Sequence, residues 1–305
     1  HIDICYAKYA FLATGGAIGD GLFLFCSGYT LFWKSQPKFS LYYKRRINRI
    51  YPSVFACVIF VYSIGLAPIA NINLKVFLGG EFVIAIMIYY VLLYIIQKYA
   101  MNKMKHIFFG VAVITIVAYW FFPYKYEVGV KGIYGISTLF RWIPYFGLML
   151  MGAAIGKRQL DRTNEKRNLR LAPILLIISG LLFYGIQLLA KTHQSVAPLQ
   201  IASLPFLYTT VYFIWKCCNF PFITKIYNNK VGNIIVMSIG GLCLESYLVQ
   251  LSLITDKFNF IFPLNIPVVV LIILLAAYLC RSFARLFSQT FGSTAYDWKQ
   301  IFSIR

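Results

Sequence analysis

The chain has 305 residues, of which 60% are hydrophobic and 12% charged, whereas soluble domains average about 45–50% apolar and about 25% charged residues. This balance excludes a water-soluble fold, because the apolar side chains exceed what the interior of one globule can bury. The net charge of +20 does not indicate nucleic-acid binding, since the basic residues stand between apolar runs and form no continuous stripe. We therefore expect an integral membrane protein in contact with lipid and with no nucleic acid.

Nine apolar segments are long enough to cross a bilayer, which takes about 17–25 residues of helix. They are 17–33, 53–70, 82–98, 107–122, 139–156, 171–190, 196–215, 232–255 and 264–284. Their continuity favours helices, because the strands of a transmembrane barrel alternate over about ten residues. We expect an all-α membrane protein, a polytopic bundle of nine transmembrane helices that forms a single domain over residues 1–305.

The loops between these segments carry basic residues very unequally. Alternate loops hold 22 Lys and Arg in one set and 6 in the other, with Arg141 left over. By the positive-inside rule the richer set, which includes the C-terminus, is cytoplasmic, and residue 1 lies outside. Because the chain starts at His1 without Met, and one upstream helix would complete this topology, we expect ten spans in the full-length protein, with the first one lacking here.

The densest polar feature is the run from Lys44 to Pro52, before the second span. On a helix Arg45, Arg46 and Arg49 face the same way, and their forked guanidinium groups are typical phosphate ligands. The alternative interpretation is that juxtamembrane arginines set the topology or contact anionic lipid. Pro52 is typical of a helix that restarts, since proline is tolerated in a first turn.

Three ionisable residues fall within or at the ends of spans, where a charge costs about 2.5–3.5 kcal/mol on insertion scales and usually serves a function. Asp20 lies at the outer start of the first span, and Arg141 is near an outer helix end, where its side chain could snorkel to the interface. Glu245 lies in the middle of a span, and Ser238 and Gly241 would share one small polar face with it. A hydrogen bond between helices explains these residues as well as catalysis does.

The order of these features resembles the acyltransferase-3 family of integral membrane acyltransferases, especially members encoded with bacterial surface-polysaccharide genes. His1 matches the family's His at the end of the first helix. Gly19 to Gly28 resembles its G-x-D-x-F-F-x-x-S-G-like span, and Arg46 to Pro52 its R-x-x-R-I-x-P loop. Arg141 to Gly156 is similar to its F-x-x-G-x-x-x-G span. Ser238 to Gln250 is similar to its late segment, although many relatives have His where this chain has Gln250.

This resemblance implies transfer of an acyl group, usually acetyl, in the bacterial inner membrane. The donor would be cytoplasmic acyl-CoA such as acetyl-CoA, and the acceptor a sugar hydroxyl of a surface polysaccharide or lipid-linked glycan. No metal-ligand set is visible in the sequence, so none is expected. A transporter or flippase of a lipid-linked saccharide is the main alternative, since it needs polar span residues and a basic cytoplasmic face but no catalytic base.

The resemblance also implies residue roles. The CoA phosphates would be held by the arginine cluster: Arg45, Arg46 and Arg49. His1 would deprotonate the acceptor hydroxyl for attack on the thioester, with Asp20 or Glu245 orienting it. The acceptor would contact Arg141 and Gln250. Three tyrosines in outside loops could stack on its sugar rings, although tyrosines are also common at membrane interfaces: Tyr124, Tyr126 and Tyr134.

Overall fold

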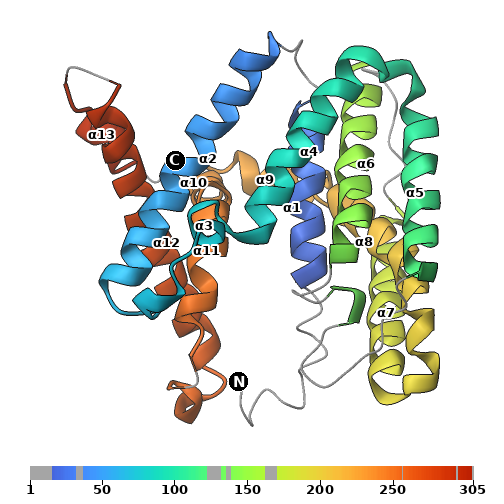
Figure 1. The fold of residues 1–305 in the computed structure, drawn as a ribbon. Helices are drawn as coiled ribbons and strands as arrows, with labels where there is room; N and C mark the ends of the chain where they lie inside the picture. The colour runs from blue at the N-terminus through green and yellow to red at the C-terminus, as the bar shows by residue number, and fades with distance from the viewer. Residues whose placement is uncertain are drawn as a thin grey trace. The chain divides into compact units, whose positions relative to one another are not determined.

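The computed structural model describes residues 16–31, 37–121, 132–134, 139–161, 170–255, 257–292 and 295–303. Every regular element in these ranges is a helix (Figure 1). The chain divides into two compact units. Within the described ranges, unit 1 comprises Pro37–Ile88 and the residues from Lys225 on, and unit 2 comprises the first helix and Tyr89–Thr224. Two helices pass from one unit to the other: α4 (Gly80–Tyr99) and α9 (Pro221–Asn228).

Unit 2 is built around the packing of α1 against α6. Its helices are α1 (Gly16–Leu31), α5 (Met104–Phe121), α6 (Trp142–Asp161), α7 (Ala172–Thr192) and α8 (Ser203–Cys217), with short 3₁₀ helices η3 (Met101–Lys103), η4 (Gly132–Tyr134), η5 (Leu139–Arg141) and η6 (Gln194–Ala202). Glycines let α1 and α6 approach closely, since a Cβ on Gly152 would lie 2.0 Å from the Phe25 carbonyl oxygen. Small residues at a helix interface are typical of packing in membranes.

Unit 1 has its core where α2, α11 and α12 meet. Its helices are α2 (Phe39–Ser63), α3 (Leu74–Phe77), α10 (Lys230–Gly241), α11 (Cys243–Leu253), α12 (Asn265–Thr290) and α13 (Trp298–Ile301), with 3₁₀ helices η2 (Ile69–Asn71) and η7 (Asn259–Ile261). The core consists of small and β-branched side chains: Ala56, Cys57, Val61, Val249, Ala276, Cys280 and Ala284. Such small side chains allow the three helix backbones to pack closely.

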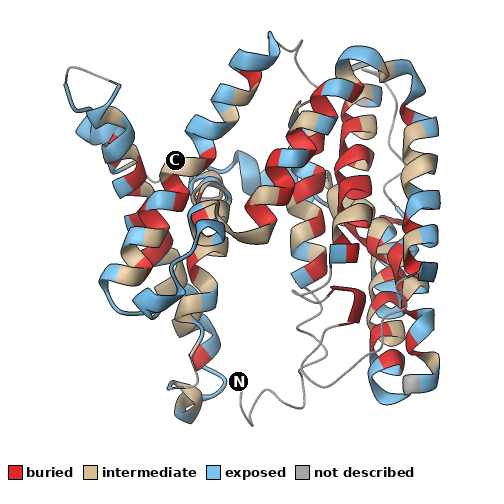
Figure 2. Cartoon of the chain, viewed as in Figure 1, coloured by how far each residue is buried: buried red, intermediate tan, exposed pale blue. Residues whose placement is uncertain are grey.

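Within the described ranges six helices are long and apolar enough to cross a membrane, and they correspond to six of the nine predicted spans: 82–98, 107–122, 139–156, 171–190, 196–215 and 264–284. A seventh, predicted at 232–255, is the pair α10 and α11, which is bent by 62° at Leu242. The window around α6 is 61% buried, whereas that around α5 is only 17% buried (Figure 2). The exposed apolar face of α5 is therefore a surface for lipid.

The other two predicted spans, and hence the total of nine, are not confirmed. In the described range α1 has 16 residues, which is short for a complete span. The predicted span 53–70 was misplaced, because α2 begins at Phe39, contains the arginine cluster and ends at Ser63. Pro52 lies inside this continuous helix, so the interpretation of a restart there was wrong. At Pro52 the helix lacks one backbone donor.

The segment after α2 turns back along it. Gly65 has a φ of +71° and Gly79 a φ of +83°, a region that glycine adopts without strain. A Cβ on Gly79 would lie 3.0 Å from Cγ2 of Val54, in the middle of α2. At Gly79 the chain therefore lies level with Val54, which is about nine residues, or about 14 Å along the helix axis, before the end of α2 at Ser63. This return brings α3 beside α2.

Candidate functional site

The arginine cluster begins a polar stripe on α2. Arg45, Arg49, Ser53 and Cys57 are spaced four residues apart, so they lie along one side of the helix. Arg45 and Arg49 are exposed, whereas the guanidinium of Arg46 is half-buried and lies 4.6 Å from the centre of the Tyr42 ring. The stripe thus changes over two turns from exposed cations to buried side chains.

The buried end of this stripe meets Glu245 of α11. The Ser53 hydroxyl donates a 2.6 Å hydrogen bond to Oε1 of Glu245, which is only 5% exposed. Oε2 of Glu245 is buried and has no hydrogen-bond partner among the described residues. Because an unsatisfied buried acceptor is costly, Oε2 is an available contact for a hydroxyl or N–H group of a ligand. Sequence reasoning missed Ser53, although its position one turn after Arg49 was a signal.

Glu245 lies in the first turn of α11, immediately after the break at Leu242. A carboxylate is favourable there, since the N-terminal end of a helix carries partial positive charge. The predicted polar face shared by Ser238, Gly241 and Glu245 was wrong, because the break interrupts the helix between Gly241 and Glu245. Gly241 instead makes room for Arg281, whose Nη1 lies 2.3 Å from where a Cβ of Gly241 would be.

Two arginines of α12 lie near the break between α10 and α11, Arg285 near Glu245 and Arg281 beside Gly241. Arg285 interacts electrostatically with Glu245 and its Nη1 donates a 2.8 Å hydrogen bond to the Gln300 carbonyl, which ties α12 to α13. Nη1 of Arg281 is buried and has no hydrogen-bond partner within the described ranges. The break between α10 and α11 is therefore flanked by one available acceptor, on Glu245, and one available donor, on Arg281.

Unit 2 holds a second charged site, around Asp20. Its carboxylate accepts a hydrogen bond from the Tyr145 hydroxyl and is attracted to Arg141. Arg141 is 6% exposed and its guanidinium lies 4.4 Å from the centre of the Trp142 ring. The expectation that Arg141 could snorkel was therefore wrong, because the side chain is buried close to Asp20. Asp20 on α1 and Arg141 at the end of η5, just before α6, are thus two predicted site residues that the fold brings together.

Two phenols brace the start of α6 beside Arg141. The Tyr89 hydroxyl donates to the Trp142 carbonyl, and the Tyr208 hydroxyl donates to the Pro144 carbonyl. Gly147 leaves the space that Tyr208 needs, since a Cβ there would lie 2.1 Å from its hydroxyl oxygen. These tyrosines carried no distinguishing signal among the 23 tyrosines of the chain. Their contacts fix the backbone that presents Arg141 and Tyr145.

The remaining predicted site residues are placed differently. Gln250 is half-buried on α11, and five positions of helix put it on a different face from Glu245. His1, Tyr124 and Tyr126 lie outside the described residues. No three His, Cys, Asp or Glu side chains of the described ranges lie close enough together to hold a metal ion.

Tyr134 was expected to be exposed for sugar stacking, and this expectation was wrong. It is 6% exposed, and its hydroxyl is 2.6 Å from Ser203 Oγ. Gln187 donates to the same oxygen at 3.0 Å, and the Gln200 side chain accepts from the Ile133 amide at 3.2 Å. Burial raises the pKa of the Tyr134 phenol. The network anchors η4 between α7 and η6, so Tyr134 has a structural place in unit 2.

These observations define a polytopic α-helical membrane protein with two buried charged sites. A family model described as an acyltransferase domain, that of the acyltransferase-3 family, matches residues 3–284. The chain therefore belongs to the acyltransferase-3 family and is a membrane acyltransferase, which confirms the resemblance seen in its motifs. No curated protein and no solved structure is significantly similar to it.

Proposed function

We propose that this acyltransferase moves an acetyl group from cytoplasmic acetyl-CoA to a sugar hydroxyl of a surface polysaccharide or lipid-linked glycan. It would act in the bacterial inner membrane, with residue 1 outside, the C-terminus cytoplasmic and residues 1–305 working as one domain. One observation carries the proposal: the stripe on α2 connects exposed arginines to the buried pair of Ser53 and Glu245.

The donor end of the proposal rests on Arg45, Arg46 and Arg49. CoA carries several phosphate oxygens, and forked guanidinium donors bind phosphates with two parallel hydrogen bonds. Arg49 lies about 6 Å along the helix axis from Ser53, and Arg45 about 12 Å. A donor held at these arginines would thus have its less polar arm directed along α2 toward Glu245.

The acceptor end rests on His1, Asp20 and Glu245. In the proposed reaction the acceptor oxygen attacks the thioester carbonyl carbon while His1 takes the hydroxyl proton. The new C–O bond forms, the C–S bond breaks, and the CoA thiolate leaves and receives a proton, which gives free CoA and the O-acetylated sugar. Asp20 or Glu245 would orient His1.

Arg141 and Gln250 would contact the acceptor. For Arg141 the support is its position beside Asp20, together with the five N–H donors of a guanidinium group. For Gln250 the support is the family resemblance alone, since it replaces the His of many relatives. An amide cannot take up a proton at neutral pH, so its role would be hydrogen bonding.

The alternative is a transporter or flippase of a lipid-linked saccharide. The 62° break between α10 and α11 favours it, because discontinuous helices are common at transport sites. Membership of the acyltransferase-3 family favours acyl transfer. We therefore keep acyl transfer as the proposed function.

Labelled acyl transfer tests both proposals. Membranes containing the protein are incubated with acetyl-labelled acetyl-CoA and glycan acceptor, and wild type is compared with His1→Ala and Arg49→Ala. Lys105→Ala is the matched control, since Lys105 is an exposed basic residue near the start of α5. We expect labelled glycan with wild type and the control and strongly reduced label with the other two. Undiminished transfer in both would reject the site, and glycan movement without acylation would support the alternative.

A further inference from the structure

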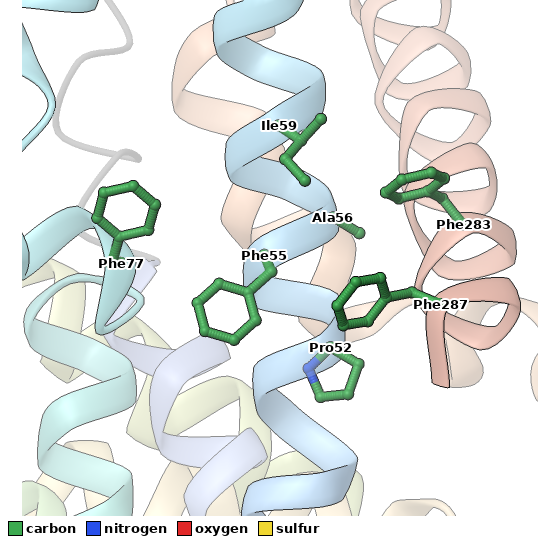
Figure 3. A pocket seen from close by; sticks show the side chains of 7 residues that line it. All are labelled: Pro52, Phe55, Ala56, Ile59, Phe77, Phe283 and Phe287. Atoms are coloured by element: carbon green, nitrogen blue, oxygen red, sulfur yellow. The ribbon is translucent and has the colours of Figure 1, made fainter. Parts of the chain in front are cut away.

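Unit 1 contains an apolar pocket that the proposed reaction does not use. Its volume is about 160 Å³, and no polar side chain lines it. Figure 3 shows Pro52, Phe55 and Ile59 on α2, with Phe283 and Phe287 facing them from α12 and Phe77 at the end of α3. A cavity of about 150 Å³ holds a benzene-sized molecule, so this pocket can hold about six carbons of a chain.

The pocket opens on an exposed face of the helices. Ile59 is 48% and Phe283 42% exposed. In a bilayer such a face contacts lipid chains. A ligand can therefore enter the pocket from the side, directly from the membrane.

A second stripe on α2 leads to this pocket. Lys44, Asn48, Pro52, Phe55 and Ile59 follow one another at intervals of four, four, three and four residues, so they share one side of the helix. This side is adjacent to the one that carries Arg49 and Ser53. Lys44 and Asn48 are exposed. A cation and an amide thus stand directly above an apolar pocket.

The length of this stripe matches one leaflet of a bilayer. Fifteen residues separate Lys44 from Ile59, which is about 22 Å of helix. Half of a bilayer with its headgroups is about 20–22 Å thick. We propose that α2 and α12 form a binding site for a glycerophospholipid, with its phosphate at Lys44 and Asn48 and one acyl chain in the pocket.

The donor acyl-CoA fits this stripe less well than a phospholipid does. In a phospholipid only glycerol separates the phosphate from its chains, whereas the pantetheine arm with its two amides separates the CoA phosphates from the acyl group. Between Asn48 and Phe55 this side of α2 offers one polar side chain, the half-buried Tyr51, for the two amides, and burying an amide without a hydrogen bond is unfavourable. We therefore assign this site to a lipid, on the side of α2 next to the one that carries the proposed donor site.

Any selectivity between lipids must come from the contacts of the headgroup with Lys44 and Asn48. Lipid chains are as apolar as the pocket walls, so filling the pocket alone discriminates little between lipids. One basic residue near the surface of an anionic membrane favours binding by about fivefold. Reversing the charge at Lys44 should therefore reduce occupancy by at least about that factor.

Photolabelling with a lipid tests the proposal. The full chain is reconstituted in phosphatidylcholine vesicles that contain a phosphatidylglycerol with a photoreactive diazirine in one chain, and the labelled residues are mapped by mass spectrometry. We expect label concentrated on the pocket residues, and a loss of about fivefold or more in Ile59→Trp, which fills the pocket, and in Lys44→Glu. The matched controls are Ile114→Trp and Lys105→Glu, both on exposed positions of α5, and should leave the pocket label unchanged.

Three results would overturn the proposal. One is label spread evenly over the lipid-facing helices, with Ile114 labelled as strongly as Ile59. Another is displacement of the pocket label by added decanoyl-CoA, which would assign the pocket to the acyl donor. The third is cross-linking of the pocket to a second protein chain. An unchanged thermal unfolding midpoint shows that a variant is folded, so a loss of label confined to the pocket then reports binding.

Discussion

Ser53 and Glu245 are joined by a 2.6 Å hydrogen bond across 192 positions of the sequence. This contact fixes α2, which carries the arginine cluster, to the first turn of α11 after the helix break. It also leaves Oε2 of Glu245 as a buried acceptor without a partner among the described residues. The same two side chains therefore link α2 to α11 and place a carboxyl group in the interior of unit 1.

Replacing Ser53 with Ala should destabilise the protein. Oε1 of the buried Glu245 would then lose the Ser53 donor, as Oε2 already has no hydrogen-bond partner among the described residues, and the loss costs about 1–3 kcal/mol. We expect a lower midpoint of thermal unfolding in detergent, with Ser53→Thr retaining most of the wild-type value. Ser63→Ala, at the exposed end of the same helix, is the control and should have no effect. An unchanged midpoint in Ser53→Ala would mean that the hydrogen bond contributes nothing to folding.

Replacing Glu245 with Gln should separate stability from activity. The amide oxygen can still accept the Ser53 hydrogen bond, so the thermal midpoint should change little. The negative charge is lost, and if Glu245 orients the base, acyl transfer should fall by about tenfold to a hundredfold or more. The measurement is labelled acyl transfer at saturating donor beside an unfolding curve. Full activity in Glu245→Gln would leave Asp20 as the orienting carboxylate.

Alkaline pH should weaken the anchor of η4. Burial raises the folded-state pKa of Tyr134 above the value of about 10 for an unfolded tyrosine. Its contribution to stability is therefore fully present below pH 10 and is lost as the pH rises through the folded-state pKa. We expect the difference in unfolding midpoint between wild type and Tyr134→Phe to be constant below about pH 9 and to shrink above about pH 10. A difference that stays constant up to about pH 11 would contradict this contribution of the buried phenol.

Most of the spans could be predicted from the sequence because apolar length alone decides membrane crossing. The start of α2 could not be predicted in this way. Hydropathy ends a span at charged residues, whereas the helix begins at Phe39 and continues through the arginine cluster. The break at Leu242 was also missed, since residues 232–255 are apolar on both sides of it. Hydropathy reports solvent preference and carries little information on helix direction.

The charged residues of the site were easier to find than their partners. Asp20, Arg141 and Glu245 stood out because charge is rare in spans. Ser53 and Tyr145 did not, because a serine or tyrosine is common in this chain and only the fold brings it to a carboxylate. The burial of Tyr134 was missed for the same reason, since its partner Ser203 lies 69 residues away.

Asp20 and Arg141 should behave as a coupled pair in unit 2. Asp20 and Arg141 attract each other and Arg141 is buried, so removing one of them leaves the charge of the other less compensated, which lowers stability. We expect Arg141→Met alone to lower the unfolding midpoint more than the double variant Asp20→Asn with Arg141→Met, because the double variant leaves no lone charge. Unfolding curves of wild type, Arg141→Met, Asp20→Asn and the double variant complete a double-mutant cycle, which gives the coupling energy. Purely additive effects would show that the two side chains do not stabilise each other.

The contact between α1 and α6 should tolerate no side chain at Gly152. A Cβ there would lie 2.0 Å from the Phe25 carbonyl oxygen, which is backbone and cannot rotate away. Gly152→Ala must push the helices apart, and overpacking of this kind costs about 1–3 kcal/mol or more.

Gly185→Ala on α7 is the matched control, because nothing lies within 4 Å of its added Cβ and alanine favours a helix by about 1 kcal/mol. We expect a lower unfolding midpoint for Gly152→Ala and an equal or higher one for Gly185→Ala, measured by thermal unfolding in the same detergent. Equal midpoints for the two variants would contradict the close approach of α1 and α6.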